Sequence, residues 1–390
     1  MNTENYRDCP ICKSTESNII KNITIMIPEE YKLPSKYNIV SCSNCGFCYA
    51  DTSATEEQYD YYYKNCNIYA TDTKNRNNIE SEFSICKDVM LEILDKDSTL
   101  LNIGVGNADF EIEGLKNGYK NIIGLDPSKN SMHVLEKNGI KGILGSIYET
   151  NKELIGKIDG VFAFYTFEHL LNPRLAIEQM IKYLKPNGKI FICVPDYELV
   201  EKSQIATPNH FNQEHINYFS EVSLNNLLSI YGFKPIHSKK IIYKATEFDE
   251  YSVMCVYAKD DCIENNLLDI DLKTKLSIKE YLKDQEKVED KYAKKIKVLI
   301  DRNEPVIIWG TGALTMNLLT TTDLNKCNII AYTDNNKSKI GTIFNNKYII
   351  SPEKLSKITG TIVIASMLYS KDIEKQIEIM GLSNEVITLN

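Results

Sequence analysis

The middle of this 390-residue chain alternates between two hydrophobic patterns. From residue 99 on, short apolar runs of strand length are separated by segments whose apolar residues recur at helical spacing. Strands that alternate with helices are typical of a parallel, doubly wound sheet. The expected strands cover 99–105, 121–126, 140–145, 157–166 and 188–195, and the expected helices between them cover 108–118, 131–139 and 175–185.

A helix and a pair of strands frame this pattern. The helix is predicted over 79–96, before the first strand. The strands, 234–243 and 251–259, are expected to pair antiparallel at the edge of the sheet. Residues 260–303 are highly charged, and their helical pattern favours a linking or packing helix.

A second strand–glycine–helix unit begins near residue 305. Its opening resembles that of the middle pattern, so a second α/β unit is predicted. The expected strands cover 305–310, 328–334 and 360–366, with a helix over 312–321 and a short helix starting at 351–355.

Residues 1–55 have a different character, with two short β-like runs and two close cysteine pairs. Cys9 and Cys12 form CPIC, and Cys42 and Cys45 form CSNC. Each C-x-x-C turn points two thiolates at one ion, and two such turns complete a closed tetrahedron. Because four thiolates leave no position for water, we predict a structural zinc site. The alternative is four free cysteines.

Composition bounds the class of protein. The length indicates two or three domains, and 43% hydrophobic with 25% charged residues fits a globular protein. The net charge is −8 and no basic stripe is present, which argues against a nucleic-acid partner. No apolar run has the length of a membrane span, and the N-terminus lacks a signal-peptide core, so a cytoplasmic location is expected. The odd count of 11 cysteines argues against a complete disulfide framework.

The first strand of the middle pattern runs into a candidate cofactor loop. Gly104 and Gly106 follow this strand directly, and glycine allows both a tight turn and a close approach by a ligand. Asp126 ends the next strand, where a carboxylate can accept hydrogen bonds from both ribose hydroxyls of an adenosyl group. Dinucleotide and S-adenosylmethionine sites share these features, and a lone G-x-G is a weak signal.

The sequence downstream favours S-adenosylmethionine. The block GVFAFYTFEHLLNPRLAIEQMIKYLKPNGKIFICVPD closely resembles the region around strands four and five of class I methyltransferases. The third glycine of a dinucleotide fingerprint is replaced by Asp109, or by Ala108 in the tighter variant. The alternative is an α/β domain with ordinary turn glycines. The candidate cofactor contacts are Asn102, Gly104, Gly106, Ala108, Asp126, Ser146 and Tyr165.

Of these contacts, Asn102 departs from the usual methyltransferase pattern, and Ser146 is inferred from its position alone. Asn102 stands where an acidic residue usually ends the first strand, so it cannot offer charge to the aminoacyl group. Ser146 follows the third strand, where the adenine amino group is usually met. Glu168 and His169 form a Glu-His pair after the fourth strand, and a role in shaping the start of a helix is favoured over acid–base chemistry.

Taken in order, the CPIC and CSNC pairs, the middle block, QEHINYFS and WGTGALTMNLL…AYTDNNKSKIG resemble the three-domain sugar C-methyltransferases. The resemblance implies an α/β protein in which a class I methyltransferase Rossmann-like sheet is flanked by a small N-terminal zinc module and a C-terminal Rossmann-like domain. It implies a zinc-binding module at 1–55, a tyrosine-rich lid or linker at 56–78, an S-adenosylmethionine domain at 79–258, a helical linker at 259–303 and the C-terminal domain at 304–390.

The same resemblance implies a catalytic pair. Glu214 and His215 match the Glu-His pair of the family. The imidazole of a histidine has an ordinary pKa of about 6.5, so a neutral His215 can remove a proton at cytoplasmic pH. Glu214 would orient the ring. Asn212 stands where the family has a tyrosine, and an amide cannot shuttle a proton. Besides C-methylation next to a ketone, an oxygen or nitrogen acceptor therefore stays open. The alternative for His215 is a capping or buried polar residue.

The substrate is expected to be a nucleotide-linked sugar or another small molecule. In the tyrosine-rich segment, Tyr63 is a candidate contact, since a tyrosine can pack on a sugar and donate a hydrogen bond. By resemblance, the C-terminal unit holds the nucleotide end through Gly310, Gly312 and Asp334. The alternatives are a packing domain without a ligand and an NAD site, although Thr315 replaces the third glycine of an NAD fingerprint.

We therefore predict an S-adenosylmethionine-dependent methyltransferase that acts on a nucleotide-activated sugar or related glycan precursor. A non-catalytic sugar-nucleotide binding protein that retained the fold is the alternative, and Asn102 and Asn212 keep it open. A dehydrogenase or epimerase that uses the C-terminal unit is the third hypothesis.

Overall fold

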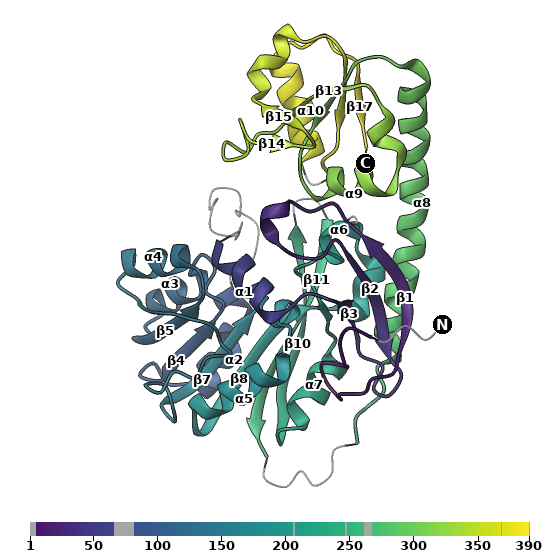
Figure 1. Cartoon of the computed structure of the whole chain (residues 1–390). Coiled ribbons are helices and arrows are strands. Elements are labelled where there is room, and N and C mark those ends of the chain that lie inside the picture. The colour runs from purple at the N-terminus through teal and green to yellow at the C-terminus, as the bar shows by residue number, and fades with distance from the viewer. Residues whose placement is uncertain are drawn as a thin grey trace. The chain divides into compact units, whose positions relative to one another are not determined.

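The computed structural model describes residues 5–65, 82–205, 207–245, 248–260, 267–367 and 369–389 (Figure 1). They divide into two compact units, each described by itself below. The first comprises residues up to Ile23, Pro28–Ser203 and Gln213–Glu280, and the second comprises Thr24–Ile27, Gln204–Asn212 and the chain from Tyr281 on. Within the described ranges, no helix is both long enough and apolar enough to span a membrane.

The first unit is built on a seven-stranded sheet with the order β10-β11-β8-β7-β4-β5-β6. The strands from β8 to β6 are parallel, whereas β11 runs antiparallel to β8 and pairs antiparallel with β10. The expected α/β class and the antiparallel edge pair are thus confirmed. The strands are β4 (Thr99–Ile103), β5 (Asn121–Asp126), β6 (Lys141–Leu144), β7 (Ile158–Phe164), β8 (Leu184–Pro195), β10 (Phe233–Ala245) and β11 (Phe248–Lys259).

Helices flank this sheet, and local capping explains where two of them begin (Figure 1). Asn172 caps α5 by accepting a hydrogen bond from the Leu175 amide, and Pro173 fits the first helical turn, where no amide donor is needed. Ser220 and Ser223 form a reciprocal capping box at the start of α7. The helices are α2 (Glu82–Ile93), α3 (Asp109–Lys116), α4 (Lys129–Lys137), α5 (Pro173–Tyr183) and α7 (Glu221–Ser229).

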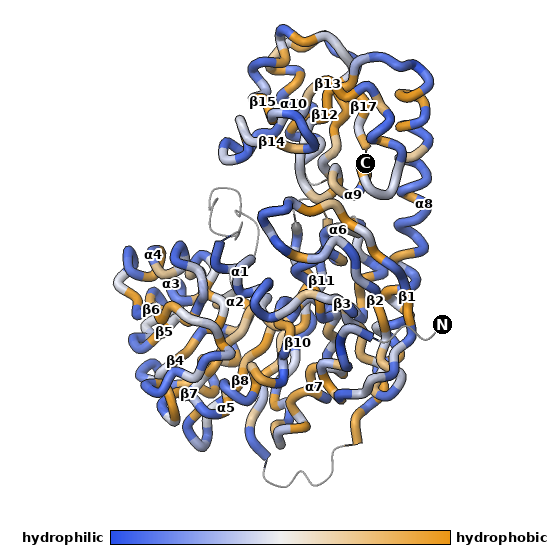
Figure 2. Tube along the Cα trace, in the orientation of Figure 1, coloured by the Kyte–Doolittle hydropathy of each residue, from blue (hydrophilic) through white to orange (hydrophobic). Residues whose placement is uncertain are grey.

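Aromatic rings fill the core on one side of the central strands. The rings of Phe162 and Phe191 stack with centroids 4.2 Å apart, and Phe110 of α3 lies 4.6 Å from Phe162. All three side chains are fully buried. In Figure 2 the hydrophobic colour follows the central strands, as expected for a sheet covered on both faces.

The N-terminal segment forms a separate four-stranded sheet with the order β1-β2-β3-β9. Its last strand, β9, is distant in sequence from the other three. Cys48 and Tyr49 of β3 pair with Tyr218 and Asn217 of β9. The tyrosine-rich segment begins as a helix, α1, and residues 66–78 of the expected lid lie outside the described residues. The elements are β1 (Ser17–Thr24), η1 (Glu29–Tyr31), β2 (Lys36–Cys42), β3 (Cys48–Thr52), β9 (Asn217–Tyr218) and α1 (Glu56–Asn65).

The second unit holds a six-stranded sheet with the order β14-β15-β13-β12-β16-β17, which confirms a second α/β unit. β15, β13, β12, β16 and β17 pair in parallel, and β14 is antiparallel. Its elements are α6 (Thr207–His210), β12 (Val306–Trp309), α9 (Ala313–Thr321), β13 (Ile329–Thr333), β14 (Ile343–Phe344), β15 (Lys347–Ile350), β16 (Thr361–Ile364), α10 (Ser370–Ile379) and β17 (Val386–Thr388), with the later part of α8 (Leu272–Arg302).

Some elements differ from the sequence prediction. β8 begins at Leu184, whereas the helix was expected to reach Lys185. Pro186 explains the difference, because the residue before a proline avoids helical backbone angles. The expected helix at 351–355 is a 3-10 helix over Pro352–Lys357. The helices α7 and α10 and the strand β17 were not predicted.

Candidate active site

The topology of the first sheet places the candidate site. β4 has β5 on one side and β7 on the other, so the chain reverses its direction of travel across the sheet between β4 and β7. Ligands of open α/β sheets bind outside the carboxyl ends of the strands at such a switch point. The loop after β4 and the residues after β7 meet there.

Gly104 makes the turn after β4 at a position that no other residue suits. Its φ is +82°, and a Cβ atom there would lie 2.4 Å from Oγ1 of Thr166. The Thr166 hydroxyl is itself held 3.0 Å from the carbonyl oxygen of Ile103. Gly106 has a φ of +53° and open space around it. The first glycine therefore serves close packing, and the second leaves room for a ligand.

Asp126 holds this loop in place. Its Oδ2 accepts hydrogen bonds from the amides of Val105 at 2.8 Å and Gly106 at 3.4 Å, and Oδ1 accepts one from Ser128 at 2.7 Å. Burial raises the pKa of Asp126, and these amides oppose that rise. The carboxylate thus orders the glycine loop before any ligand arrives.

A buried Asn–Glu pair supports the loop from behind, and sequence reasoning missed half of it. Asn102 is fully buried and donates a hydrogen bond from Nδ2 to Oε1 of Glu111 at 2.9 Å. Glu111 lies on α3, is also fully buried, and its Oε2 has no hydrogen-bond partner. Burial raises the pKa of Glu111 to about 7. The carboxyl group that the sequence lacks at position 102 is thus present one element later, on α3.

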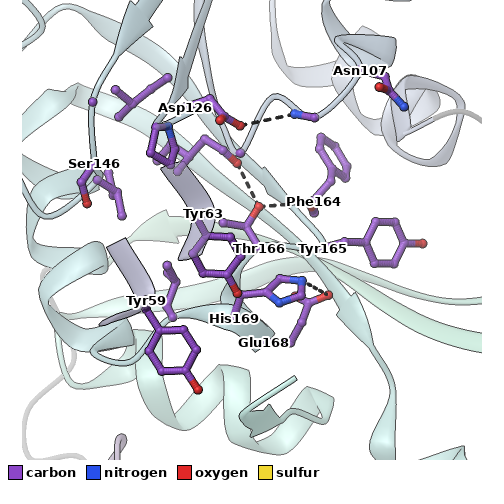
Figure 3. A pocket seen from close by; sticks show the side chains of 18 of the residues that line it. Tyr59, Tyr63, Asn107, Asp126, Ser146, Phe164, Tyr165, Thr166, Glu168 and His169 are labelled. Carbon is purple, nitrogen blue, oxygen red and sulfur yellow. Dashed lines mark hydrogen bonds and ion pairs between the residues drawn. The ribbon is translucent and has the colours of Figure 1, made fainter. Parts of the chain in front are cut away.

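A cavity of about 650 Å³ opens in front of the loop. Figure 3 shows Asp126 and Ser146 at one end of it and Tyr59, Tyr63 and His169 at the other. Of the predicted residues, those that line the cavity are Tyr63, Gly104, Gly106, Asp126, Ser146, Tyr165 and His215. Asn102, Ala108 and Glu214 are not among its lining residues.

Tyr165 stands out in this lining by its backbone. Its φ of +49° is in the left-handed region, which a bulky side chain rarely adopts. Its amide donates to the carbonyl oxygen of Cys193 at 2.8 Å, so β8 fixes the strained position. Strain of this kind, held by surrounding structure, is concentrated at functional sites. The turn at Tyr165 directs the chain after β7 along the wall of the cavity.

The far end of the cavity combines two imidazoles and a carboxyl group. The rings of His169 and His215 lie 4.9 Å apart at 77°, and Nδ1 of His215 lies 3.3 Å from the hydroxyl of Tyr197. Glu168 is 1% exposed, and burial raises its pKa to about 8. Burial lowers the pKa of His169. Both shifts favour uncharged side chains at neutral pH.

Glu214 and His215, the predicted catalytic pair, contact different parts of the structure. The carboxylate of Glu214 accepts a hydrogen bond from the hydroxyl of Tyr62 on α1. Its backbone carbonyl lies 3.0 Å from Nδ1 of His169. Glu214 therefore links the tyrosine-rich helix to the cavity wall, and His215 reaches the cavity itself.

The four predicted zinc ligands come together. One sulfur atom from each of Cys9, Cys12, Cys42 and Cys45 lies within 4.8 Å of the others. The Cys9–Cys45 and Cys12–Cys42 sulfur atoms are 3.6 and 3.4 Å apart. A tetrahedral zinc ion with bonds of about 2.3 Å would separate its sulfur ligands by about 3.8 Å, so the geometry fits. Cys48 lies outside this cluster, with its thiol 3.6 Å from the Gly46 carbonyl oxygen.

The remaining predicted residues belong to the second unit. Asn212 donates from Nδ2 to the carbonyl oxygen of Asn209 at 3.2 Å. Gly310 and Gly312 flank the turn after β12, and Asp334 follows β13. Oδ2 of Asp334 accepts from the amide and the hydroxyl of Thr311 at 2.9 and 2.6 Å. Their role in binding a substrate remains a prediction.

Comparison with known proteins matches the two α/β regions separately. Residues 80–238 match the family model described as a methyltransferase domain, and residues 302–388 match the model "C2185-like, N-terminal". Human EEF1A lysine methyltransferase 2 is 31% identical over 133 residues, which cover 32% of this chain and 53% of that protein. The chain therefore spans about half the length of this curated relative.

Solved structures give distant likenesses. The 1,6-didemethyltoxoflavin-N1-methyltransferase of Burkholderia thailandensis is 16% identical, with a TM-score of 0.37 over 45% of this chain and 77% of that one. The PH0226 protein of Pyrococcus horikoshii is 17% identical, with a TM-score of 0.38 over 53% of this chain and 100% of that one. The match of residues 80–238 to the methyltransferase domain model, together with the likeness to the human lysine methyltransferase, supports the expectation that the chain is an S-adenosylmethionine-dependent methyltransferase.

Proposed function

We propose that this protein transfers a methyl group from S-adenosylmethionine to a nucleotide-activated sugar or related glycan precursor. One observation carries the proposal. A single cavity holds the glycine loop with Asp126 at one end, and Tyr63 with His215 at the other. A cofactor bound by the loop and an acceptor placed beside the imidazole would share one cavity, as methyl transfer requires.

In this proposal the two ends have separate tasks. The loop amides and Asp126 bind the adenosyl group, with Ser146 at the adenine. S-adenosylmethionine supplies an electrophilic methyl group when bound. His215 removes the proton from the acceptor, held by the Tyr197 hydroxyl at Nδ1. For a keto sugar His215 would take the proton from the carbon next to the ketone, which would make that carbon nucleophilic toward the methyl group of the bound cofactor.

Calorimetry tests the cofactor half of the proposal. S-adenosylmethionine and its demethylated product should bind the full-length protein with one site per chain. No binding at millimolar ligand would remove the proposal. His215→Ala should leave this affinity intact, because the imidazole lies at the acceptor end, and should abolish methyl transfer. Unchanged transfer by the variant would refute the role of His215 as the base.

The acceptor is identified by screening. Nucleotide sugars are incubated with labelled cofactor, and mass spectrometry follows methyl transfer together with uptake of solvent deuterium next to a ketone. Deuterium uptake supports C-methylation. Methyl transfer without it points to an oxygen or nitrogen acceptor. Cofactor binding without any transfer, to sugars or to a cell extract, would favour the non-catalytic binding protein.

A nitrogen acceptor is the second candidate, and the charge of the cavity favours it. Glu56 and Asp60 of α1 and Asp109 and Glu113 of α3 line the cavity, and Lys116 on α3 is the only Lys or Arg in that lining. An acidic wall attracts a cationic amine. The human relative is by name a lysine methyltransferase. Lysine-containing peptides therefore belong in the same screen, where methylation of a peptide but of no nucleotide sugar would replace the sugar assignment.

We also propose that the four-cysteine cluster holds one structural Zn²⁺ and that Gly310, Gly312 and Asp334 hold the nucleotide end of the substrate. Elemental analysis should find one zinc per chain that these four cysteines hold. Ser substitution of Cys9 and Cys12 together should remove it and lower the melting temperature, because metal binding contributes folding free energy. Zinc-free protein with unchanged melting behaviour would contradict the structural role.

A further inference from the structure

Three cavity residues outside the cysteine cluster converge on one point. Glu168, His169 and His215 each offer one ligand atom, and these atoms lie within 4.8 Å of one another. Glu168 and His169 belong to the 3-10 helix η2 (Phe167–His169), which follows β7, and His215 lies just before β9. All three line the cavity, and Figure 3 shows Glu168 and His169 at the end away from Asp126, with the His215 ring 4.9 Å from that of His169. Two imidazoles and a carboxylate are a recurrent ligand set for divalent transition metals.

Each imidazole is already oriented by a contact at its Nδ1 atom. Nδ1 of His169 lies 3.0 Å from the backbone carbonyl oxygen of Glu214, and Nδ1 of His215 lies 3.3 Å from the Tyr197 hydroxyl. Metal-bound histidines usually have such a contact, which fixes the ring and directs the other nitrogen to the ion. With Nδ1 so engaged, Nε2 is the nitrogen that would bind metal in both residues.

Glu168 supplies an independent observation. The side chain is 1% exposed, its Oε2 has no hydrogen-bond partner, and its Oε1 lies 3.9 Å from Nε2 of His169 (Figure 3). A buried carboxyl oxygen without a partner is costly unless something compensates for it. A cation between the carboxyl group and the two imidazoles would do so.

We propose that Glu168, His169 and His215 form a divalent-cation site at the acceptor end of the cavity. Nitrogen-rich ligands favour Zn²⁺ and Co²⁺ over Mg²⁺, which prefers oxygen. Three protein ligands leave at least one coordination position for water or an acceptor oxygen. In one respect the inference rests on the proposed function. A bound ion would occupy the lone pair of His215 that proton removal needs. His215 therefore cannot bind the cation and act as the base at the same time.

Cobalt titration tests the site on the full-length protein. The cysteine cluster is first filled with one equivalent of zinc, and Co²⁺ is then added while visible absorption and calorimetry are recorded. We expect one further Co²⁺ per chain, with the weak bands of nitrogen and oxygen ligation and without the intense thiolate bands of a cysteine site. Glu168→Gln, which keeps the shape of the side chain, and His169→Ala should each weaken this binding at least tenfold.

The control is His133→Ala, which removes an exposed imidazole from α4 and should bind Co²⁺ like the wild type. Binding of S-adenosylmethionine by every variant shows that the fold is intact. The cation site is refuted if the wild type takes up no cobalt beyond the cysteine cluster, or if both variants bind it as tightly as the wild type. Cobalt binding by a protein that binds no S-adenosylmethionine would instead overturn the proposed function alone.

Discussion

The two glycine loops of this chain solve the same structural problem with different chemistry. In each unit a central parallel strand, β4 or β12, runs into a glycine turn, and an aspartate at the end of the next strand accepts hydrogen bonds from that turn. Asp126 receives only backbone amides at this oxygen, whereas Asp334 also receives the Thr311 hydroxyl and lies 3.6 Å from the Lys339 ammonium. The second carboxylate also accepts the amide of Asn336, so it combines two backbone amides with a hydroxyl and an ammonium group.

This difference separates loop order from ligand binding. Both aspartates hold their turns in shape, so the G-x-G and Asp pattern by itself reports a stable turn. The first loop lines a large cavity. Gly106 in this loop has open space around it, as Gly312 has in the second loop. A glycine pattern is therefore evidence for a cofactor when its turn also lines a cavity.

The largest expected effect on cofactor affinity comes from replacing Asp126 by alanine. Asp126→Ala removes the two amide bonds that order the first loop and the candidate ribose acceptor. Two charge-assisted hydrogen bonds amount to about 3 kcal/mol, so affinity for S-adenosylmethionine should fall about a hundredfold in calorimetry. Asp334→Ala is the matched control and should leave this affinity unchanged. Equal losses in the two variants would mean that the loops do not differ in this way.

The glycines should give the next largest effect. Gly104→Ala places a methyl group against Thr166 at a backbone angle that alanine resists, which costs about 1–2 kcal/mol before any clash. We expect at least about a tenfold loss of cofactor affinity. In Gly312→Ala the new methyl group meets no atom within 4 Å, and φ is −93°, so affinity and stability should stay as they are. An unaffected Gly104→Ala variant would contradict the close packing described here.

Thr311→Val tests the side-chain half of the second loop. The change removes the hydroxyl that donates to Asp334 and should cost about 1 kcal/mol, or a fall of about 4 °C in the melting temperature for a unit of this size. Thr321→Val is the control, because that hydroxyl only bonds the carbonyl oxygen of Asn317 within the same helix. S-adenosylmethionine affinity should not change. If both variants melt alike, the Thr311 bond contributes nothing specific.

Much of this comparison could be predicted from the sequence, because it is local. A glycine turn after a strand and an aspartate at the end of the next one follow from hydrophobic spacing and the geometry of parallel sheets. The cluster of the two cysteine pairs could also be predicted, since each C-x-x-C turn is a local structure. These residues lie within a few positions of the elements that place them.

Contacts set by tertiary packing could not be predicted. Arg7 is buried and donates to the carbonyl oxygens of Ala50 and Leu171 and to the side chain of Asn217, which are distant in sequence. No spacing rule connects these positions. The convergence of His169 with His215 likewise depends on the loop before β9 folding back on the 3-10 helix after β7. The missed partner of Asn102 has the same origin, since α3 must dock on the sheet before Glu111 is buried.

That buried pair gives the smallest expected effect on the cofactor and the sharpest contrast between the loops. The second loop rests on the neutral Thr315, whose hydroxyl lies 2.6 Å from the Gly310 carbonyl oxygen, whereas the first rests on a titratable carboxyl group. Because burial raises the pKa of Glu111 to about 7, the folded protein keeps this proton to higher pH than the unfolded chain does. The free energy of unfolding should therefore fall as pH rises from about 4.5 to about 7.

Glu111→Gln keeps the acceptor for Asn102 and abolishes the titration. The variant should lose this part of the pH dependence and unfold at a higher temperature than the wild type at pH 8, while S-adenosylmethionine affinity changes by less than about threefold. Glu136→Gln, on the exposed face of α4, is the control and should follow the wild-type pH profile. Thermal melts at several pH values measure the difference. A Glu111→Gln profile parallel to the wild type would show that this carboxyl group is ionised in the fold, and the first loop would then rest on a buried charge.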